Sequence, residues 1–233
     1  MKHLLIIVII SLFSATVSAQ NLEAFFKSSD MFFSTYVKNG LVDYKNINAT
    51  DLEDILANAS KISLSKSNAK NYQAFWINAY NLAVIKGLLD NMPIKSPLDK
   101  VGFFDKTTYS LAGKQITLNS IENKMLRANF KDARFHFVLV CGALGCPPLI
   151  SQAYLPKTLD AQLTAQTKKA INGSFLKVKK NKIAASEIMK WYNEDFTMNG
   201  TSEIDFINTY RTEKVSEKAK ISYFPYNWTI NKQ

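Results

Sequence analysis

The chain has 233 residues, and its 29 Lys and Arg residues against 19 Asp and Glu residues give a formal net charge of +10 at pH 7. This length suffices for one domain with a substantial core and is short for two. The positive residues are spread along the chain, which is typical of a solvated lysine surface. Because the N-terminus indicates export, we expect no nucleic-acid partner. The sequence has no glycine-rich phosphate loop after a strand and no Cys-x-x-Cys-His motif, so we expect no nucleotide, flavin or haem cofactor.

The first 19 residues have the three parts of a secretory signal. Residues 1–3 form a short positive start, residues 4–13 an apolar run, and residues 17–19 a small-residue cleavage pattern that ends at Ala19. The apolar run is about half the length of roughly 20 residues that a membrane-spanning helix needs. We therefore expect cleavage near Ala19, no transmembrane span, and an exported protein that is periplasmic or secreted.

The first half of the remaining chain is predicted to be helical. Apolar residues recur at helical spacing over residues 22–37, a capping box at residues 50–53 begins a second helix, and residues 71–89 form a long third helix that ends before Pro93. A hairpin is expected at residues 108–118 and a helix at 119–130. The apolar run from Phe135 to Cys141 is predicted to be a buried strand.

The second half returns to helices, at about residues 157–171, 187–196 and 202–211. Between the first two lies the run KVKKNK, from Lys177 to Lys182, which is typical of a basic hairpin. The chain shows no Pro/Gly/Ser linker and no internal repeat. We therefore expect a helix-rich α+β single domain over residues 20–233, built around a small, mainly antiparallel sheet.

The chemically reactive residues are concentrated in one short segment. After residue 19 the chain contains one histidine, His136, and both cysteines, Cys141 and Cys146, follow within ten positions. On an extended strand His136 and Cys141 would point to opposite faces and lie about 16 Å apart, at roughly 3.3 Å per residue. Cys141 is therefore not expected to reach His136.

Cys146 is the better candidate nucleophile. Gly142 and Gly145 allow the chain to turn back toward the sheet, and Pro147 suits the first position of a following helix. A thiolate at such a helix N-terminus would be stabilised by free backbone N–H groups, which would lower its pKa.

Three other interpretations of this segment stay open at the level of sequence. Cys141 and Cys146 can form a structural disulfide in an exported protein. Zinc bound by His136 and the two thiols is disfavoured by the strand geometry, so no metal site is expected. His136 can also be a buried histidine with a backbone or carboxylate partner.

Glu122, Asn78 and Asn81 are further candidate residues. Glu122 stands three residues after Asn119, where it serves either as a helix-capping residue or as the carboxylate that orients His136. Asn78 and Asn81 fall on a helix face that should be buried, so both amides need specific hydrogen-bond partners. Those partners are either the backbone of a loop or a ligand in a pocket beside Cys146.

Five tracts in this order resemble the domain-of-unknown-function family 547. They are YQAFWINAYN from residue 72, IENKMLR from 121, RFHFVLVCGALGCPPL from 134, IMKWYNEDF from 188 and YNWTIN from 226. The resemblance covers about residues 70–233 and implies that the tracts belong to one compact domain, with Glu122, His136, Cys141 and Cys146 as a candidate site. It implies no activity, because the function of the family is not established. Val140 and Gly145 depart from the polar residues that the family pattern has beside the two cysteines.

Two functional hypotheses follow. In the first, the domain is a thiol-dependent hydrolase or acyl transferase acting on an amide or ester of the cell envelope. Cys146 is then the nucleophile, His136 the base and Glu122 the orienting carboxylate, with Cys141, Asn78, Asn81 and Gly145 around them. In the second, it is a non-catalytic envelope binding module with a Cys141–Cys146 disulfide. The sequence leaves the ligand open among a small molecule, a peptide and a glycan, and it does not indicate an oligomeric state.

Overall fold

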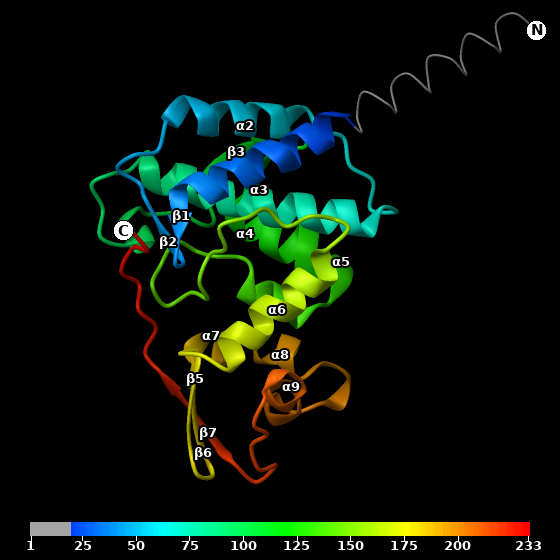
Figure 1. Ribbon diagram of the computed structural model, residues 1–233, viewed down its shortest axis with the longest axis vertical. Coiled ribbons are helices and arrows are strands. Elements are labelled where there is room, and N and C mark those ends of the chain that lie inside the picture. The colour runs from blue at the N-terminus through cyan, green and yellow to red at the C-terminus, as the bar shows by residue number, and fades with distance from the viewer. Residues whose placement is uncertain (1–19) are drawn as a thin grey trace, which may run out of the picture.

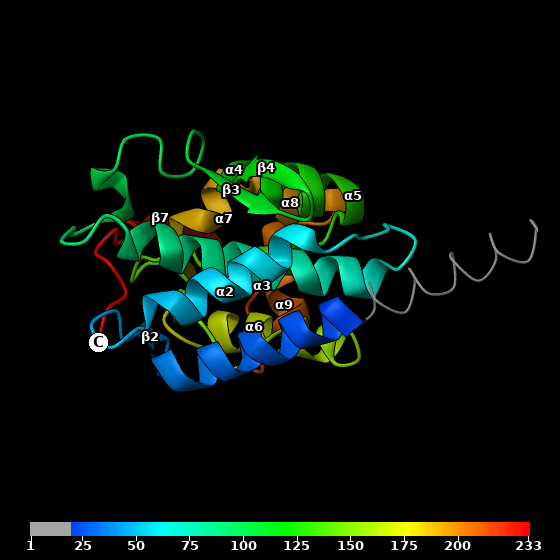
Figure 2. The ribbon, with the colours of Figure 1, turned by 90° about the horizontal axis from the view of Figure 1, so that it is seen from above.

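A long buried helix, α3 (Ala69–Leu89), lies at the centre of the structure, a computed structural model that describes residues 20–233 (Figures 1 and 2). Apolar residues occur on nearly every side of α3, so it is buried around most of its circumference. The side chain of Asn68 accepts a hydrogen bond from the backbone N–H of Asn71 and caps the first turn. The predicted signal and its cleavage site lie outside the described residues.

The elements that cover α3 are largely those expected. Residues 20–36 are helical, β1 (Val37–Lys38) and β2 (Leu41–Val42) form a short hairpin, and α2 (Ala49–Lys61) packs on α3. The hairpin of β3 (Thr108–Leu111) and β4 (Lys114–Thr117) packs against α2, where the N–H of Ala112 in its turn donates to the carbonyl of Ala59 at 2.9 Å. A continuous helical stretch follows, made of α4 (Leu118–Ser120), a π-helix (Ile121–Arg127) and α5 (Ala128–Phe130).

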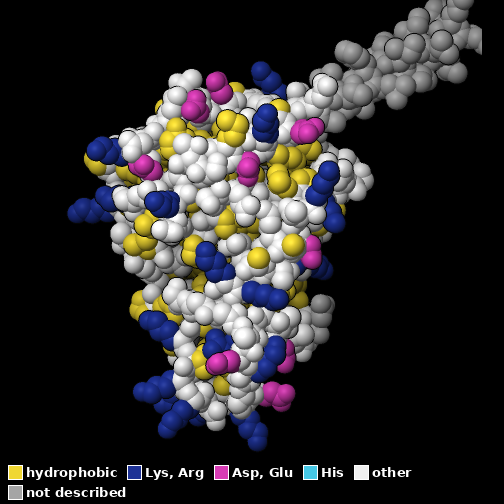
Figure 3. Space-filling view, viewed as in Figure 1, with side chains coloured by type: hydrophobic (Ala, Val, Ile, Leu, Met, Phe, Trp, Pro, Cys, Tyr) yellow, Lys and Arg dark blue, Asp and Glu magenta, His cyan; other side chains and the backbone are white. Residues whose placement is uncertain are grey.

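The C-terminal part combines short helices with a three-stranded sheet. After α6 (Leu159–Ile171), the sheet has the order β5 (Leu176–Lys179), β6 (Lys182–Ser186), β7 (Lys220–Phe224). Strands β5 and β6 are antiparallel, whereas β6 and β7 are parallel. Helices α7 (Glu187–Trp191), α8 (Asn193–Phe196) and α9 (Glu203–Tyr210) lie between β6 and β7 in sequence. The KVKKNK run forms the expected hairpin, and Figure 3 shows Lys and Arg side chains gathered at that end of the molecule.

The helix-rich α+β class is thus confirmed, with one difference in the strands. They form three separate small sheets rather than one, and all their pairings except β6–β7 are antiparallel. Within residues 20–233, no helix is both long and apolar enough to cross a bilayer.

The predicted strand from Phe135 to Cys141 is wrong. Residues Ala133–Phe137 form a 3-10 helix, and the chain is irregular from Val138 to Cys141. Asp132 starts this helix by accepting a hydrogen bond from the backbone N–H of Arg134 at 3.0 Å. A short apolar run does not distinguish a strand from another buried segment by periodicity alone.

The side chain of Asn81 replaces the neighbouring strand that this segment lacks. Its amide nitrogen donates to the carbonyl oxygen of Val138, and its amide oxygen accepts from the N–H of Val140, both at 2.9 Å. These are the backbone groups that a paired strand would otherwise satisfy. One residue of α3 therefore holds the segment that leads to Cys141 in an irregular conformation.

Two clusters of buried apolar residues make up the core. The larger surrounds α3, and the smaller lies among α6, α9 and the β5–β6–β7 sheet. Cys146 packs against both clusters, so the cysteine loop lies where they meet.

Candidate active site

A pocket of about 230 Å³ opens where the two core clusters meet. It is lined by residues from every candidate tract of the sequence: Tyr80, Phe104, Asn119, Glu122, His136, Leu139, Cys141, Cys146, Ile188, Trp191, Tyr192, Tyr226 and Trp228. His136 and both cysteines therefore share one cavity. The expectation that Cys141 faces away from His136 fails together with the strand on which it was based.

The C-terminal tail holds the cysteine loop in place. The N–H groups of Leu144 and Gly145 donate to the carbonyl oxygens of Thr229 and Asn227 at 2.7 and 2.8 Å, and the N–H of Asn231 donates to the carbonyl of Gly142 at 3.0 Å. Pairing of the loop with the tail brings the side chains of residues 226 and 228 to the pocket.

Gly145 permits the close approach of Tyr226. A Cβ atom at position 145 would lie 2.8 Å from three atoms of the Tyr226 ring, a distance that real Cβ atoms do not show. The absence of a side chain at this position therefore has a structural reason. Gly145 does not act on a ligand directly, but it sets the position of a residue that does contact the thiols.

Both cysteines are free thiols, and the hydroxyl of Tyr226 lies between them. The hydroxyl oxygen is 2.9 Å from Sγ of Cys141 and 2.8 Å from Sγ of Cys146. The backbone N–H of Cys141 also donates to Sγ of Cys146 at 3.0 Å. The sulfur of Cys146 thus receives the hydrogen bonds that stabilise a thiolate.

The two thiols differ in acidity. Burial raises the pKa of Cys146, but hydrogen bonds from the Cys141 thiol, the Tyr226 hydroxyl and backbone N–H groups outweigh burial, so its pKa lies below the ordinary value. Burial, followed by the hydrogen bond to Cys146 and the charge on it, raises the pKa of Cys141 well above the ordinary value. Burial and the same thiolate charge raise the pKa of Tyr226, which therefore remains a proton donor. Cys146 is therefore the more acidic thiol of the pair.

The source of this activation differs from the predicted one. Residues 147–150 are irregular, Pro147 does not begin a helix, and the next helix is α6 at Leu159. The N–H of Cys141 and the hydroxyl of Tyr226 act on the thiol in place of a helix N-terminus.

His136 is 4% exposed and is held by Asp195, a residue of α8. Its Nε2 lies 2.6 Å from Oδ2 of Asp195, and Nε of Arg127 lies 2.5 Å from the same oxygen. Burial raises the pKa of Asp195, but the hydrogen bonds from His136 and Arg127 hold that pKa well below its usual range. Because Asp195 is a carboxylate, Nε2 of His136 is the donor, and Nδ1 is the acceptor of the neutral ring.

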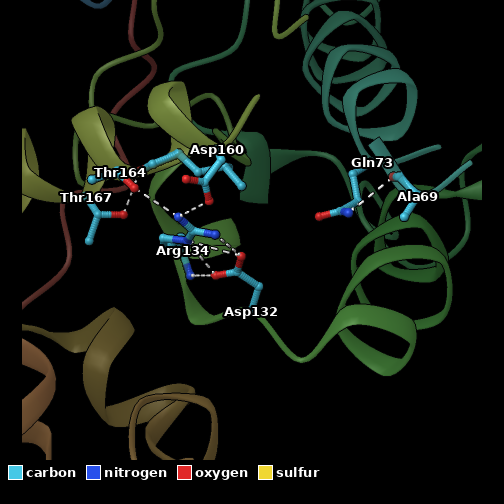
Figure 4. Close-up of polar contacts among 8 residues, drawn as sticks. Ala69, Gln73, Asp132, Arg134, Asp160, Thr164 and Thr167 are labelled. Atoms are coloured by element: carbon cyan, nitrogen blue, oxygen red, sulfur yellow. Dashed lines mark hydrogen bonds and ion pairs between the residues drawn. The ribbon is translucent and has the colours of Figure 1, made fainter. Parts of the chain in front are cut away.

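Tyr192 and Arg134 fix the histidine further. The Tyr192 ring stacks on the imidazole at a centroid distance of 4.0 Å. Arg134, two residues before His136, binds Asp132 and Asp160 with its guanidinium, which ties the 3-10 helix to α6 (Figure 4). The imidazole is therefore restrained on its ring face, at Nε2 and through its backbone.

Glu122 lies on the opposite side of the imidazole from Asp195. Its Oε1 is 3.9 Å from Nδ1 of His136. The carboxylate also hydrogen-bonds Tyr192, and the pKa of that tyrosine is raised first by burial and second by the charge of Glu122. Glu122 does not cap a helix with Asn119, because Thr117 is the N-cap of α4. The carboxylate that hydrogen-bonds and orients His136 is Asp195, whereas Glu122 faces Nδ1.

Asn78 and Asn81 are buried and bind loop backbone rather than lining the pocket. Asn78 pairs with the backbone of Tyr154, donating to its carbonyl at 2.8 Å and accepting from its N–H at 2.9 Å. Asn81 makes the corresponding pair with Val138 and Val140. Both residues support the loops around the pocket from α3.

Three contributors to the site were not singled out from the sequence: Asp195, Arg127 and Tyr226. All lie in tracts quoted for the family resemblance, so the tracts themselves were the available signal. Among residues 20–233, no group of three or more His, Cys, Asp and Glu side chains is arranged to hold a metal ion.

The chain is a helix-rich α+β protein with an aromatic-lined pocket in which two free thiols meet an imidazole held by a carboxylate. Over residues 64–171 it matches the family model described as "Protein of unknown function, DUF547", which confirms the resemblance in that range. The match includes Glu122, His136 and both cysteines, whereas Asp195, Tyr226 and Trp228 lie beyond it. No curated protein and no solved structure gives a significant match to the chain.

Proposed function

We propose that this chain is a thiol-dependent acyl hydrolase or acyl transferase, exported to the cell envelope, in which Cys146 is the nucleophile. The observation that carries the proposal is the pair of donors on Sγ of Cys146, from the Cys141 backbone and the Tyr226 hydroxyl. They lie in a cavity shared with a histidine that a carboxylate orients. Nucleophile, base and orienting acid are the three parts of such a site.

The reaction proceeds in two steps. The thiol of Cys146 first gives its proton to Nδ1 of His136 through water in the cavity. The thiolate attacks the carbonyl carbon of an ester or amide, the C–O or C–N bond breaks, and the departing alcohol or amine takes that proton from the His136 imidazolium. Water or an acceptor alcohol or amine then attacks the thioester carbonyl and gives its proton to Nδ1 of His136. The C–S bond breaks, and Cys146 leaves as the thiolate.

The carboxylates have different roles in this scheme. Asp195 holds Nε2 and fixes the tautomer in which Nδ1 is basic. Glu122 faces Nδ1 and stabilises the imidazolium formed when that nitrogen is protonated. The hydrogen-bond partners of His136 in the described chain do not include either sulfur. Protons therefore pass between His136 and the Cys146 thiol through substrate or water in the cavity.

The contact between the two thiols supports a second candidate function. The Cys141 thiol donates a hydrogen bond to Cys146, so exchange with an external disulfide, which is reduced to two thiols, can join them in a disulfide across a loop of four residues. In that state the domain would be the non-catalytic binding module of the second hypothesis.

Alkylation of the native mature chain, purified without reductant, separates the two candidates. We expect two alkylatable thiols, with Cys146 reacting with iodoacetamide at pH 6 faster than a free cysteine derivative. The matched variants are Cys146→Ala, which should lose the fast phase, and Cys141→Ala, which should keep one alkylatable thiol that reacts more slowly than in the wild type, because one hydrogen bond to Sγ of Cys146 is lost. A quantitative Cys141–Cys146 disulfide in the native protein would exclude Cys146 as a resting nucleophile and favour the binding module.

A further inference from the structure

The lining of the pocket lacks the lysines and arginines that dominate the rest of the chain. The net charge of the protein is +10, yet neither Lys nor Arg lines the cavity, and Glu122 is its one acidic lining residue. The other carboxylate near the site, Asp195, is balanced by Arg127 at 2.5 Å. The cavity of this lysine-rich chain is thus lined by a largely buried carboxylate, that of Glu122, and by the acidic thiol of Cys146.

Aromatic rings form one continuous wall of this cavity. The ring of Trp228 lies 4.6 Å from Tyr226, 5.9 Å from Trp191 and 6.4 Å from Phe104, measured between centroids. Trp191 and Trp228 are stacked at 23°, and Trp191 is 46% exposed. The wall therefore reaches from solvent down to the hydroxyl that contacts both thiols.

Such a wall together with one carboxylate selects for positive charge. The faces of tryptophan and tyrosine rings are electronegative and attract ammonium groups, most strongly where water is excluded. An anionic ligand would meet both the ring faces and Glu122, with no Lys or Arg of the lining to offset them. A neutral ligand would gain from the apolar surface alone.

We infer that the pocket binds an ammonium group, primary or quaternary, against the Trp228–Tyr226–Trp191 wall, with Glu122 balancing its charge. The inference deepens the proposed function, on which it rests for the acyl part, by making the substrate an ester or amide of an amine-bearing compound. The volume of about 230 Å³ lies below the range of about 300–1,000 Å³ of sites for drug-sized ligands, so a single head group or side chain fits rather than a polymer backbone.

The test compares choline with 3,3-dimethylbutanol, an uncharged compound of the same shape. Binding to the mature chain is measured by tryptophan fluorescence and by calorimetry, first on the wild type and then on Cys146→Ala. The same comparison is made with butylammonium and butanol. We expect at least one cation to bind tenfold or more tightly than its neutral counterpart, which corresponds to about 1.4 kcal/mol.

Variants identify the groups responsible. Glu122→Gln should abolish most of the preference for the cation, and Trp228→Leu should weaken both members of a pair but the cation more. Glu217→Gln, which removes an exposed carboxylate that does not line the pocket, is the control that should change neither the affinity nor the preference for the cation. If Glu122→Gln does not fold, the comparison of each cation with its neutral isostere on the wild type still tests whether the pocket prefers a positive charge.

Two outcomes would overturn the inference. One is equal affinity for a cation and its isostere, which would make the wall an apolar platform, suited for example to a sugar ring. The other is no binding of either cation at millimolar concentration. Cation preference without thioester formation on Cys146 would support this inference and contradict the proposed function. Thioester formation without cation preference would support the proposed function and contradict this inference.

Discussion

The Nε2 atom of His136 lies 2.6 Å from Oδ2 of Asp195, a residue 59 positions later in the chain. Arg127 donates to the same oxygen, and its guanidinium also lies over the Tyr192 ring that stacks on the imidazole. Two other segments of the sequence, around Arg127 and from Tyr192 to Asp195, thereby fix one histidine. The arrangement determines which nitrogen of His136 is free to act as a base.

Replacing Asp195 by Asn should impair the reaction with little change in substrate binding. The amide no longer favours the tautomer with the proton on Nε2, so Nδ1 loses basicity, and we expect kcat to fall about 100-fold or more. Steady-state kinetics on an activated ester measure this. Asp160→Asn, which changes a largely exposed partner of Arg134, is the control, and equal losses in the two variants would argue against a specific role for Asp195.

The same pair makes stability depend on pH. The pKa of Asp195 is depressed in the folded state, so its contribution is fully present above the unfolded value of about 3.9 and is lost as the pH falls through the folded pKa. Urea unfolding of wild type and Asp195→Asn should therefore differ most above about pH 5 and converge in more acidic solution. A gap that widens toward low pH would contradict this assignment.

Removing the hydroxyl of Tyr226 should make Cys146 less acidic. Tyr226→Phe deletes one of the donors to Sγ, and a hydrogen bond to a charged group contributes about 1.5 kcal/mol or more. We expect alkylation of Cys146 at pH 6 to slow about tenfold, because the thiolate fraction falls. Tyr223→Phe, whose hydroxyl contacts Glu203, should leave the rate unchanged.

Gly145→Ala should also slow the alkylation of Cys146, in this case by displacing Tyr226. The new methyl group has no room beside the Tyr226 ring, so the ring must shift away from the thiols. Strain of this kind costs about 1–3 kcal/mol. The free energy of unfolding and the alkylation rate should both fall, and a variant with unchanged thiol reactivity would show that Tyr226 does not activate Cys146.

Asn81→Leu should destabilise the protein by about 2 kcal/mol or more. The substitution leaves the carbonyl of Val138 and the N–H of Val140 without their partner in a buried setting. Denaturant unfolding measures the loss, and Asn78→Leu should behave alike because Asn78 makes the same kind of pair with Tyr154. A change below about 0.5 kcal/mol would mean that water or another group replaces the amide.

The sequence predicted the elements whose signals are local. Helix α3 has a long apolar run that ends before Pro93, and the two predicted hairpins, β3–β4 and β5–β6, have alternation around short polar turns. The segment from His136 to Cys146 was misassigned because its conformation depends on Asn81 and on the tail around Asn227 and Thr229, which are distant in sequence.

Only part of the site could be predicted, because the sequence identifies a site residue only where that residue is rare or lies in a recognisable tract. His136 and the cysteines stand out as the rare reactive residues of the chain, and Glu122 belongs to a quoted tract, so these could be named. Asp195 is one of many acidic residues, and only the fold shows that its carboxylate meets the imidazole.

The central claim is that Cys146 becomes acylated, and intact-mass spectrometry tests it most directly. The mature chain is mixed with p-nitrophenyl acetate near neutral pH, quenched in acid, and mapped by peptide analysis. The account predicts one acetyl group on Cys146, absent in Cys146→Ala, present in Cys141→Ala, and longer-lived in His136→Ala because deacylation lacks its base. Acetylation only of lysines, at a rate that Cys146→Ala does not change, would contradict it.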